Sequence, residues 1–329
     1  MKLKLHYIVP FLLIALIGFS EFAWGARQGV SKAKRDPLFL MLTASQVIMP
    51  EKVIIDAQRG YFDEFYTIQI YINDHGPYRF ILDTGAELNY ISQELARELA
   101  LKVMETKKLR VVTATQKETF ITETRHHAKA VKMGQAIFKD VYFNAGTDFE
   151  DDASLMKRVG VHGIMGMNTF YHTLLTLDLK REKIILTRGD LLQNKKAGPL
   201  KMYRFSPRVP GIIITQEAVP NEFVVDTGFF GKFRINYCGT LDGLSVSKPA
   251  VEIQSYDLYD KAEKSYYATL KGKIKIHDLL IENPEIVYTI HSCLPSQKFY
   301  RFGLLGVALL RQYQVTFDQK NNKILFVKN

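Results

Sequence analysis

Short runs of alternating hydrophobic and polar residues make up most of the chain from Val53 onward. Residues 66–72 alternate and are rich in β-branched and aromatic side chains, residues 73–76 are turn formers, and residues 78–82 are apolar. Together these segments predict a β-hairpin. One helix is predicted at residues 93–100. Further strands are predicted at short spacing, at residues 110–115, 118–124, 131–133, 141–143, 174–177 and 183–186. The pattern therefore predicts a mostly β protein.

Two passages of the chain repeat each other. Residues 163–186 align without a gap with residues 303–326 at a constant offset of 140, which keeps the glycines, an aspartate and a lysine in register. Residues 80–85 (FILDTG) match residues 223–228 (FVVDTG) at an offset of 143. Two matched pairs at nearly the same spacing predict that the chain is a duplication of one unit.

The N-terminus has the pattern of an export signal. Two lysines precede a largely apolar run at residues 7–19, and Ala23 and Gly25 form a small-residue cleavage site. A membrane anchor is the alternative, but a span needs about 20 apolar residues, and Glu21 ends the run early. We expect cleavage before Ala26, no stable membrane anchor afterwards, and a periplasmic or secreted protein.

These features predict five segments. The chain is divided into a signal peptide (1–25), an N-terminal tether (26–49), a first lobe (50–190), a linker (191–201) and a second lobe (202–329). The linker lies within the polar stretch 188–201, which is rich in Asn, Lys, Gly and Pro.

The composition excludes some classes of protein. With 47% hydrophobic and 24% charged residues, the chain has ordinary globular composition and is not disordered. The net charge of +10 favours anionic surfaces but does not indicate nucleic acid, and we expect no nucleic-acid partner. The two cysteines, Cys238 and Cys293, are too few for a cysteine zinc site. In an oxidising compartment they would form one disulfide in the second lobe.

The candidate chemistry lies in the two Asp-Thr-Gly triplets. Each follows an apolar strand, so Asp83 and Asp226 each stand at the start of a tight turn that fixes the carboxylate. A pseudo-twofold that brought the two turns face to face would place the carboxylates side by side. Because like charges at that range cannot both ionise, the pair would share one proton and act as general base and general acid.

Residues 80–91 (FILDTGAELNYI), with the preceding hairpin, resemble the retropepsin-like aspartic proteases, and the whole duplicated chain resembles a two-lobed, pepsin-like bacterial form. The resemblance implies an all-β, two-lobed aspartic protease fold, with two similar β-barrel lobes related by a pseudo-twofold. It also assigns roles to matching residues. The catalytic pair would be Asp83 and Asp226, and the supporting turns would contain Thr84, Gly85, Thr227 and Gly228.

The sequence departs from the family around the expected cleft. Ala86 follows the first triplet, as the family prefers, but Phe229 follows the second, and a ring beside the dyad would narrow the cleft. The hairpin expected to cover the cleft, at about residues 110–124, has neither Gly nor Tyr, so Phe120 is its best lining candidate. The matching stretch of the second lobe, 256–267, is rich in tyrosine. Which lobe supplies the main flap stays open.

The sequence therefore favours an exported aspartic endopeptidase that hydrolyses peptide bonds with a water activated between Asp83 and Asp226. It would act as a monomer on a peptide or protein substrate, with no cofactor and no metal. His126 and His127, with an acidic run at 148–152, could suggest a cation site, but adjacent strand residues point to opposite faces, so a solvated loop is favoured. The alternative is a non-catalytic peptide-binding or envelope-interaction module on the same fold, whose turns were kept for folding alone.

Overall fold

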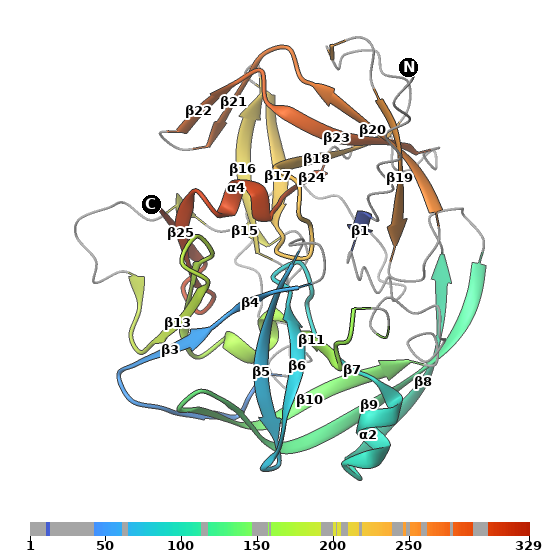
Figure 1. The fold of residues 1–329 in the computed structure, drawn as a ribbon, viewed down its shortest axis with the longest axis vertical. Coiled ribbons are helices and arrows are strands. Elements are labelled where there is room, and N and C mark those ends of the chain that lie inside the picture. Colours follow the sequence, from blue (N-terminus) through green and yellow to red (C-terminus); the bar gives the residue numbers. More distant parts are fainter. Residues whose placement is uncertain are drawn as a thin grey trace, which may run out of the picture.

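The computed structural model describes residues 11–13, 43–60, 65–112, 118–146, 157, 159–191, 200–201, 203–204, 210–216, 219–238, 246–247, 251–257, 262–276, 279–291 and 302–329. These residues form three β-sheets with a few short helices, so the all-β prediction is confirmed. In Figure 1 the first lobe, in blue to green, lies below the second lobe, in yellow to red.

The first lobe is a nine-stranded sheet in the order β2-β10-β7-β11-β6-β5-β9-β8, with β4 beside β5. An additional pairing of β10 with β9 closes strands β10, β7, β11, β6, β5 and β9 into a barrel. The bounds are β2 Gln46–Ile48, β4 Gln58–Arg59, β5 Tyr66–Ile72, β6 His75–Leu82, β7 Asn89–Ile91, β8 Lys102–Val112, β9 Glu118–Met133, β10 Ala136–Gly146 and β11 Gly163–Met165.

Local sequence accounts for the hairpin and the helix that flank the first triplet. Asn73 and Asp74 both have positive φ, 49° and 68°, as a two-residue hairpin turn requires, and they connect β5 to β6. Helix α2 (Gln93–Glu98) begins at Ser92, whose Oγ accepts a hydrogen bond from the amide of Leu95 at 3.2 Å. The predicted hairpin and the predicted helix are both confirmed.

The second lobe repeats this pairing in an eleven-stranded sheet. Its order is β1-β19-β20-β23-β18-β24-β17-β16-β21-β22, with β15 beside β16. Strand β1 comes from the predicted signal peptide and not from the second lobe, and it pairs in parallel with β19. The long strands β9 and β10 correspond here to shorter pieces, β20 with β21 and β22 with β23. The bounds are β1 Phe11–Leu13, β15 Tyr203–Arg204, β16 Pro210–Gln216, β17 Val219–Val225, β18 Phe233–Cys238, β19 Val251–Asp257, β20 Ala262–Thr269, β21 Lys273–Ile276, β22 Leu279–Glu282, β23 Glu285–His291 and β24 Phe302–Leu305.

A third, six-stranded sheet joins the lobes, in the order β14-β26-β25-β12-β13-β3. Its register follows a local twofold: Thr176 pairs with Thr316, its own counterpart at the offset of 140, and their hydroxyl oxygens are 2.8 Å apart. The bounds are β3 Lys52–Asp56, β12 Leu174–Asp178, β13 Lys183–Thr187, β14 Leu200–Lys201, β25 Tyr313–Asp318 and β26 Lys323–Lys328, and the short helices η3 (Met167–Phe170) and α4 (Val307–Leu310) precede β12 and β25.

Some predicted elements differ from the structure, and others lie outside it. Strand β8 begins at Lys102, before the predicted 110, because the polar residues of a paired hairpin still form a ladder. Much of the linker, Cys293 and nearly all of the signal peptide lie outside the described residues. Their assignments, and the domain boundaries, stay predictions. In the part of the chain that the structure describes, no helix has the length and apolarity that a membrane span requires.

Candidate active site

Each Asp-Thr-Gly triplet forms a turn at the end of a buried strand. Asp83 follows β6 and its amide donates to the carbonyl of Met165 at 3.1 Å, while Asp226 follows β17 and its amide donates to the carbonyl of Leu305 at 2.9 Å. These bonds extend the parallel pairings of β6 with β11 and of β17 with β24. Both carboxylates are buried, and both turns meet where the lobes face each other (Figure 1).

The two threonines join the turns by reciprocal hydrogen bonds. The Thr84 hydroxyl donates to the carbonyl of Val225 and the Thr227 hydroxyl donates to the carbonyl of Leu82, both at 2.6 Å. The amide of Thr84 donates to Oγ1 of Thr227 at 2.9 Å, and the amide of Thr227 donates to Oγ1 of Thr84 at 3.1 Å. Four bonds between fully buried groups therefore fix one turn against the other.

The two glycines allow the carboxylates to approach the opposite turn. A methyl group added at Gly85 would lie 2.5 Å from Cγ of Asp226, and one added at Gly228 would lie 2.9 Å from Oδ2 of Asp83. Each glycine thus lies directly against the carboxylate of the other triplet. The structure brings all six residues of the two triplets together at the interface between the lobes.

The carboxylates are oriented by the backbone of their own turns. The amides of Gly85 and Ala86 donate to Oδ1 of Asp83 at 2.8 and 3.2 Å, and the amide of Gly228 donates to Oδ1 of Asp226 at 2.7 Å. Among the described residues, no partner outside the dyad donates to the buried Oδ2 of Asp83, and a side-chain hydrogen bond with Asp226 contributes to the raised pKa of Asp83. The two carboxyls can therefore share one proton between them.

Burial and mutual repulsion shift the titration of the pair. Burial, and then the negative charge of Asp226, raise the pKa of Asp83 well above its usual range. Burial raises the pKa of Asp226 to about 6, against the lowering effects of hydrogen bonding and of the Arg234 charge. Such a pair holds one proton at neutral pH, because the second ionisation would place two charges in one buried site.

The candidate cleft residues lie in different surroundings. Ala86 is fully buried in an apolar cluster on the first lobe, with Ile81, Tyr90 and Ile164 among its members. The backbone of Phe120 pairs with Arg110 in the β8–β9 hairpin, and its side chain lies outside the described residues. The assignment of these residues to a cleft stays a prediction.

Phe229 is accommodated by a glycine two residues later. Its ring is buried, and a methyl group added at Gly231 would lie 2.4 Å from the ring. In the first lobe the sizes are reversed, since small Ala86 is followed by the larger Leu88. The ring therefore occupies space that the first lobe gives to a later side chain.

Sequence reasoning missed two residues near the dyad. Asn89 is buried, and its Oδ1 accepts hydrogen bonds from the amide of Gly166 and the hydroxyl of Thr169, both at 2.9 Å. Arg234 is only 1% exposed and is among the largest fully buried side chains of the described residues. An arginine between Phe233 and Ile235 is visible in the sequence as a charge within an apolar strand.

The two histidines contact different partners. His126 is buried and its Nε2 lies 2.9 Å from the Thr124 hydroxyl, whereas Nε2 of His127 lies 2.9 Å from Oδ1 of Asp140. The acidic run at 148–152 lies outside the described residues. Within the described ranges, no group of three or more His, Cys, Asp or Glu residues could hold a metal ion.

The region around the first triplet is similar to a family of aspartyl proteases. A family model described as gag-polyprotein putative aspartyl protease matches residues 68–172, which include Asp83 and end before Asp226. A search of the curated proteins finds no match. The match supports a retropepsin-like aspartyl protease domain in the first lobe, and with it protease chemistry on a peptide or protein substrate.

Proposed function

We propose that the protein is an exported aspartic endopeptidase that uses Asp83 and Asp226 together. One observation carries this proposal. The two buried carboxylates stand in turns joined by reciprocal threonine bonds, and each lies against the glycine of the other triplet. A duplicated chain would supply both halves of the dyad from one molecule, so that the monomer would be complete.

The arrangement suits the addition of water to a peptide carbonyl. The ionised carboxylate would take a proton from the water, whose oxygen then bonds to the carbonyl carbon, while the protonated carboxyl would give its proton to the carbonyl oxygen. In the second step the C–N bond breaks, the nitrogen takes the proton that the dyad holds, and one hydroxyl of the diol gives its proton back to the dyad as the carbonyl re-forms. The net reaction consumes one water and restores the shared proton.

The competing function is a non-catalytic peptide-binding module on the same fold, favoured by Phe229 beside the second triplet. A turn kept only for folding would not need an aspartate, because Asn also forms such turns. The two functions differ in what the carboxylates contribute, so substitutions that remove only the charge distinguish them.

The test is cleavage of casein by the mature chain and by Asp83→Asn and Asp226→Asn. Each substitution should lower kcat by about 10²- to 10⁴-fold, the usual contribution of a general acid or base. Asp56→Asn is the matched control, because Asp56 is 79% exposed and pairs with Lys183 on the surface. A statine-type inhibitor should abolish the activity of the parent and of this control.

Circular dichroism and thermal unfolding would confirm that the variants fold. If both aspartate variants bind peptide but the parent cleaves none, the binding module is the better model. If Asp226→Asn keeps full activity, the second triplet is structural and a pair of first lobes must supply the dyad. N-terminal sequencing of the exported chain should begin at Ala26, and retention of Met1 would contradict export by cleavage.

A further inference from the structure

Each lobe carries a row of paired residues that crosses the sheet beside its catalytic aspartate. Residues directly paired across neighbouring strands point to the same face. In the first lobe the row consists of Ile81, Ile164, Tyr90 and Asn144. In the second lobe it consists of Val224, Leu304, Arg234 and Val287. Register therefore makes Arg234 the counterpart of Tyr90.

This row lies on the side of the sheet that leads to the dyad. Val224 stands two residues before Asp226, and residues two apart in extended chain point to the same face. Leu304, between Val224 and Arg234 in the row, directly precedes Leu305, whose carbonyl accepts the Asp226 amide at 2.9 Å. The guanidinium of Arg234 is thus carried on the strand next but one to the catalytic turn of its own lobe.

The burial of Arg234 gives its charge a long reach. An arginine stays protonated in proteins, and a charge that is 1% exposed is screened far less than a surface charge. Tyr90, at the same position of the first lobe, carries no charge at neutral pH. The dyad therefore lies in an asymmetric field although its hydrogen bonds are nearly symmetric.

The other charged side chains named in this region are more exposed to solvent than Arg234. Lys232 and Glu285, near the start of β18 and β23, bind each other at 2.8 Å with side chains 41% and 50% exposed. Tyr267 forms a hydrogen bond with Glu285, and burial raises the pKa of its hydroxyl to about 12. The charge of Arg234 and a hydrogen bond with Asp83 both lower the pKa of Asp226, and the charge of Asp226 raises the pKa of Asp83.

We propose that Arg234 is a positioning residue that keeps Asp226 ionised, so that the proton of the dyad rests on Asp83. Asp226 would then accept the proton of the attacking water, and Asp83 would donate to the carbonyl oxygen. The titration agrees in direction, because the charge of Arg234 lowers the pKa of Asp226 while the charge of Asp226 raises that of Asp83. The assigned roles in catalysis rest on the proposed function, but the position of the proton on Asp83 does not.

The test measures the proton directly. Carbon-13 NMR of the chain labelled at the aspartate carboxyl carbons, with signals assigned through Asp83→Asn and Asp226→Asn, follows each carboxyl through a pH titration. In the parent, Asp226 should ionise in the first step. In Arg234→Met that step should move to higher pH by about one unit or more, and Asp83 should take a larger share of the first ionisation.

Two further variants separate charge from packing. Arg234→Lys keeps the charge and should retain the parental order of titration, while Arg234→Tyr reproduces the first lobe and should behave as Arg234→Met. The low-pH limb of kcat/KM should move with the NMR midpoint. An unchanged Asp226 titration in a folded neutral variant would overturn the proposal. Failure of the parent to cleave any peptide would refute the proposed function. The NMR titration would then still decide whether Arg234 keeps Asp226 ionised.

Discussion

The two lobes agree closely at the dyad and diverge within a few residues of it. Thr84 and Thr227 exchange matching hydrogen bonds across the interface, with corresponding distances that differ by at most 0.2 Å. The position after each triplet, by contrast, holds Ala86 in one lobe and Phe229 in the other. The difference indicates that pairing of the two carboxylates constrains the Asp-Thr-Gly turns, whereas the residues that follow each turn can differ between the lobes.

The same contrast continues along each row toward the hairpins. Beyond Tyr90 the first lobe continues with Asn144, Arg125 and Glu105, where Arg125 binds Glu105 at 2.7 Å. Beyond Arg234 the second lobe continues with apolar or aromatic side chains, namely Val287, Tyr267 and Val251. The charge thus lies far from the dyad in one lobe and close to it in the other.

The largest expected effect comes from filling the space between a glycine and the opposite carboxylate. Gly85→Ala would place a methyl group 2.5 Å from Cγ of Asp226, whereas Gly228→Ala would place one 2.9 Å from Oδ2 of Asp83. We expect each to lower kcat by at least about 10²-fold, since a small misplacement of catalytic groups costs that much. Gly85→Ala should lose more, as measured by casein cleavage at matched folded protein.

Gly189→Ala is a control for the loss of a glycine, because nothing lies within 4 Å of its added methyl group. Because Gly189 has a positive φ of 100°, the alanine also strains the backbone, so this control includes a backbone cost. If Gly85→Ala and Gly228→Ala kept more activity than this control, the carboxylates would not meet across the interface as described.

The next effect concerns the order of side-chain sizes after each triplet. Ala86 is small and Leu88 large in the first lobe, whereas Phe229 is large and Gly231 has no side chain in the second. Phe229→Ala removes a buried ring and should destabilise the protein by about 3–5 kcal/mol. Admission of water beside the dyad should lower the pKa of its carboxyls, so both limbs of the pH profile should move to lower pH. Urea unfolding and the pH dependence of peptide cleavage measure the two effects.

The double variant Phe229→Ala/Gly231→Leu rebuilds the first-lobe pattern and provides the matched control. It should recover part of the lost stability, because the leucine refills the space vacated by the ring. If the pH limbs of Phe229→Ala stay where they were, the ring does not influence the dyad. If activity rises many-fold, the ring blocks the cleft and the binding-module alternative gains support.

Much of the site could be predicted because its signals are local. An apolar strand that ends in Asp-Thr-Gly, repeated at a similar spacing, predicts a strand, a turn and a carboxylate without knowledge of the rest of the chain. The match of Thr176 with Thr316 also follows from the repeat. Phe229 shows the limit of such local signals. The prediction that its ring narrows the cleft rests on comparing Phe229 with Ala86 alone. The compensating Gly231 becomes visible only when both residues are compared with Ala86 and Leu88.

Other features could not be predicted because they depend on pairings between distant strands. Arg234 becomes the counterpart of Tyr90 through its register with Leu304, and one extra residue between Asp226 and β18 shifts the simple alignment by one position. At the same place, the acceptor for the glycine amide is a side chain in the first lobe and a backbone carbonyl in the second. In the first lobe the amide of Gly166 donates to Oδ1 of Asn89 at 2.9 Å, and in the second the amide of Gly306 donates to the carbonyl of Lys232 at 3.1 Å.

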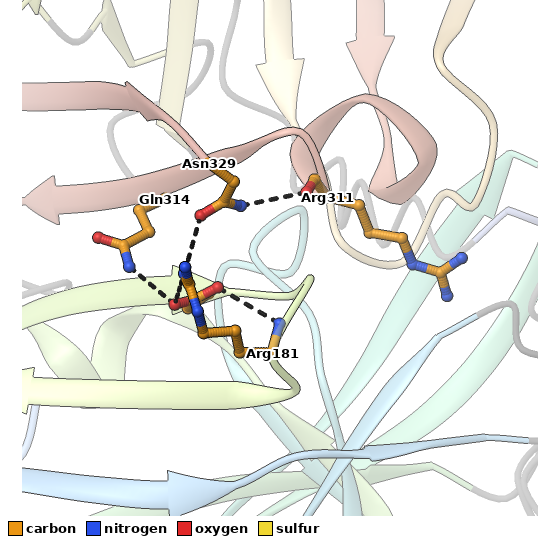
Figure 2. A network of polar contacts seen from close by, with 5 residues as sticks. Arg181, Arg311, Gln314 and Asn329 are labelled. Atoms are coloured by element: carbon orange, nitrogen blue, oxygen red, sulfur yellow. Dashed lines mark hydrogen bonds and ion pairs between the residues drawn. The ribbon is translucent and has the colours of Figure 1, made fainter.

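The smallest expected effect lies at the sheet that joins the lobes, where Asp178 and Asp318 are counterparts. Oδ2 of Asp178 accepts from Arg181 at 2.8 Å and from Gln314 at 2.7 Å, and Arg181 also reaches Asn329 at 3.2 Å (Figure 2). Oδ2 of Asp318 instead accepts from the amide of Leu191 and the side chain of Asn321, both at 2.9 Å. The first aspartate has a cationic partner, and the second is held by neutral donors.

Burial raises the pKa of Asp178, but hydrogen bonds from Arg181 and Gln314 outweigh it, so the pKa of the folded state is lowered. A lowered pKa stabilises the fold above the unfolded value of about 3.9, and this contribution is lost as pH falls through the folded pKa. Because Arg181 is 59% exposed, Asp178→Asn should cost only about 1 kcal/mol at pH 7. Urea unfolding should show the cost shrink near pH 3 and in about 0.5 M salt, whereas that of Asp318→Asn should be insensitive to salt. Equal salt dependence of the two variants would contradict the distinction between the two aspartates.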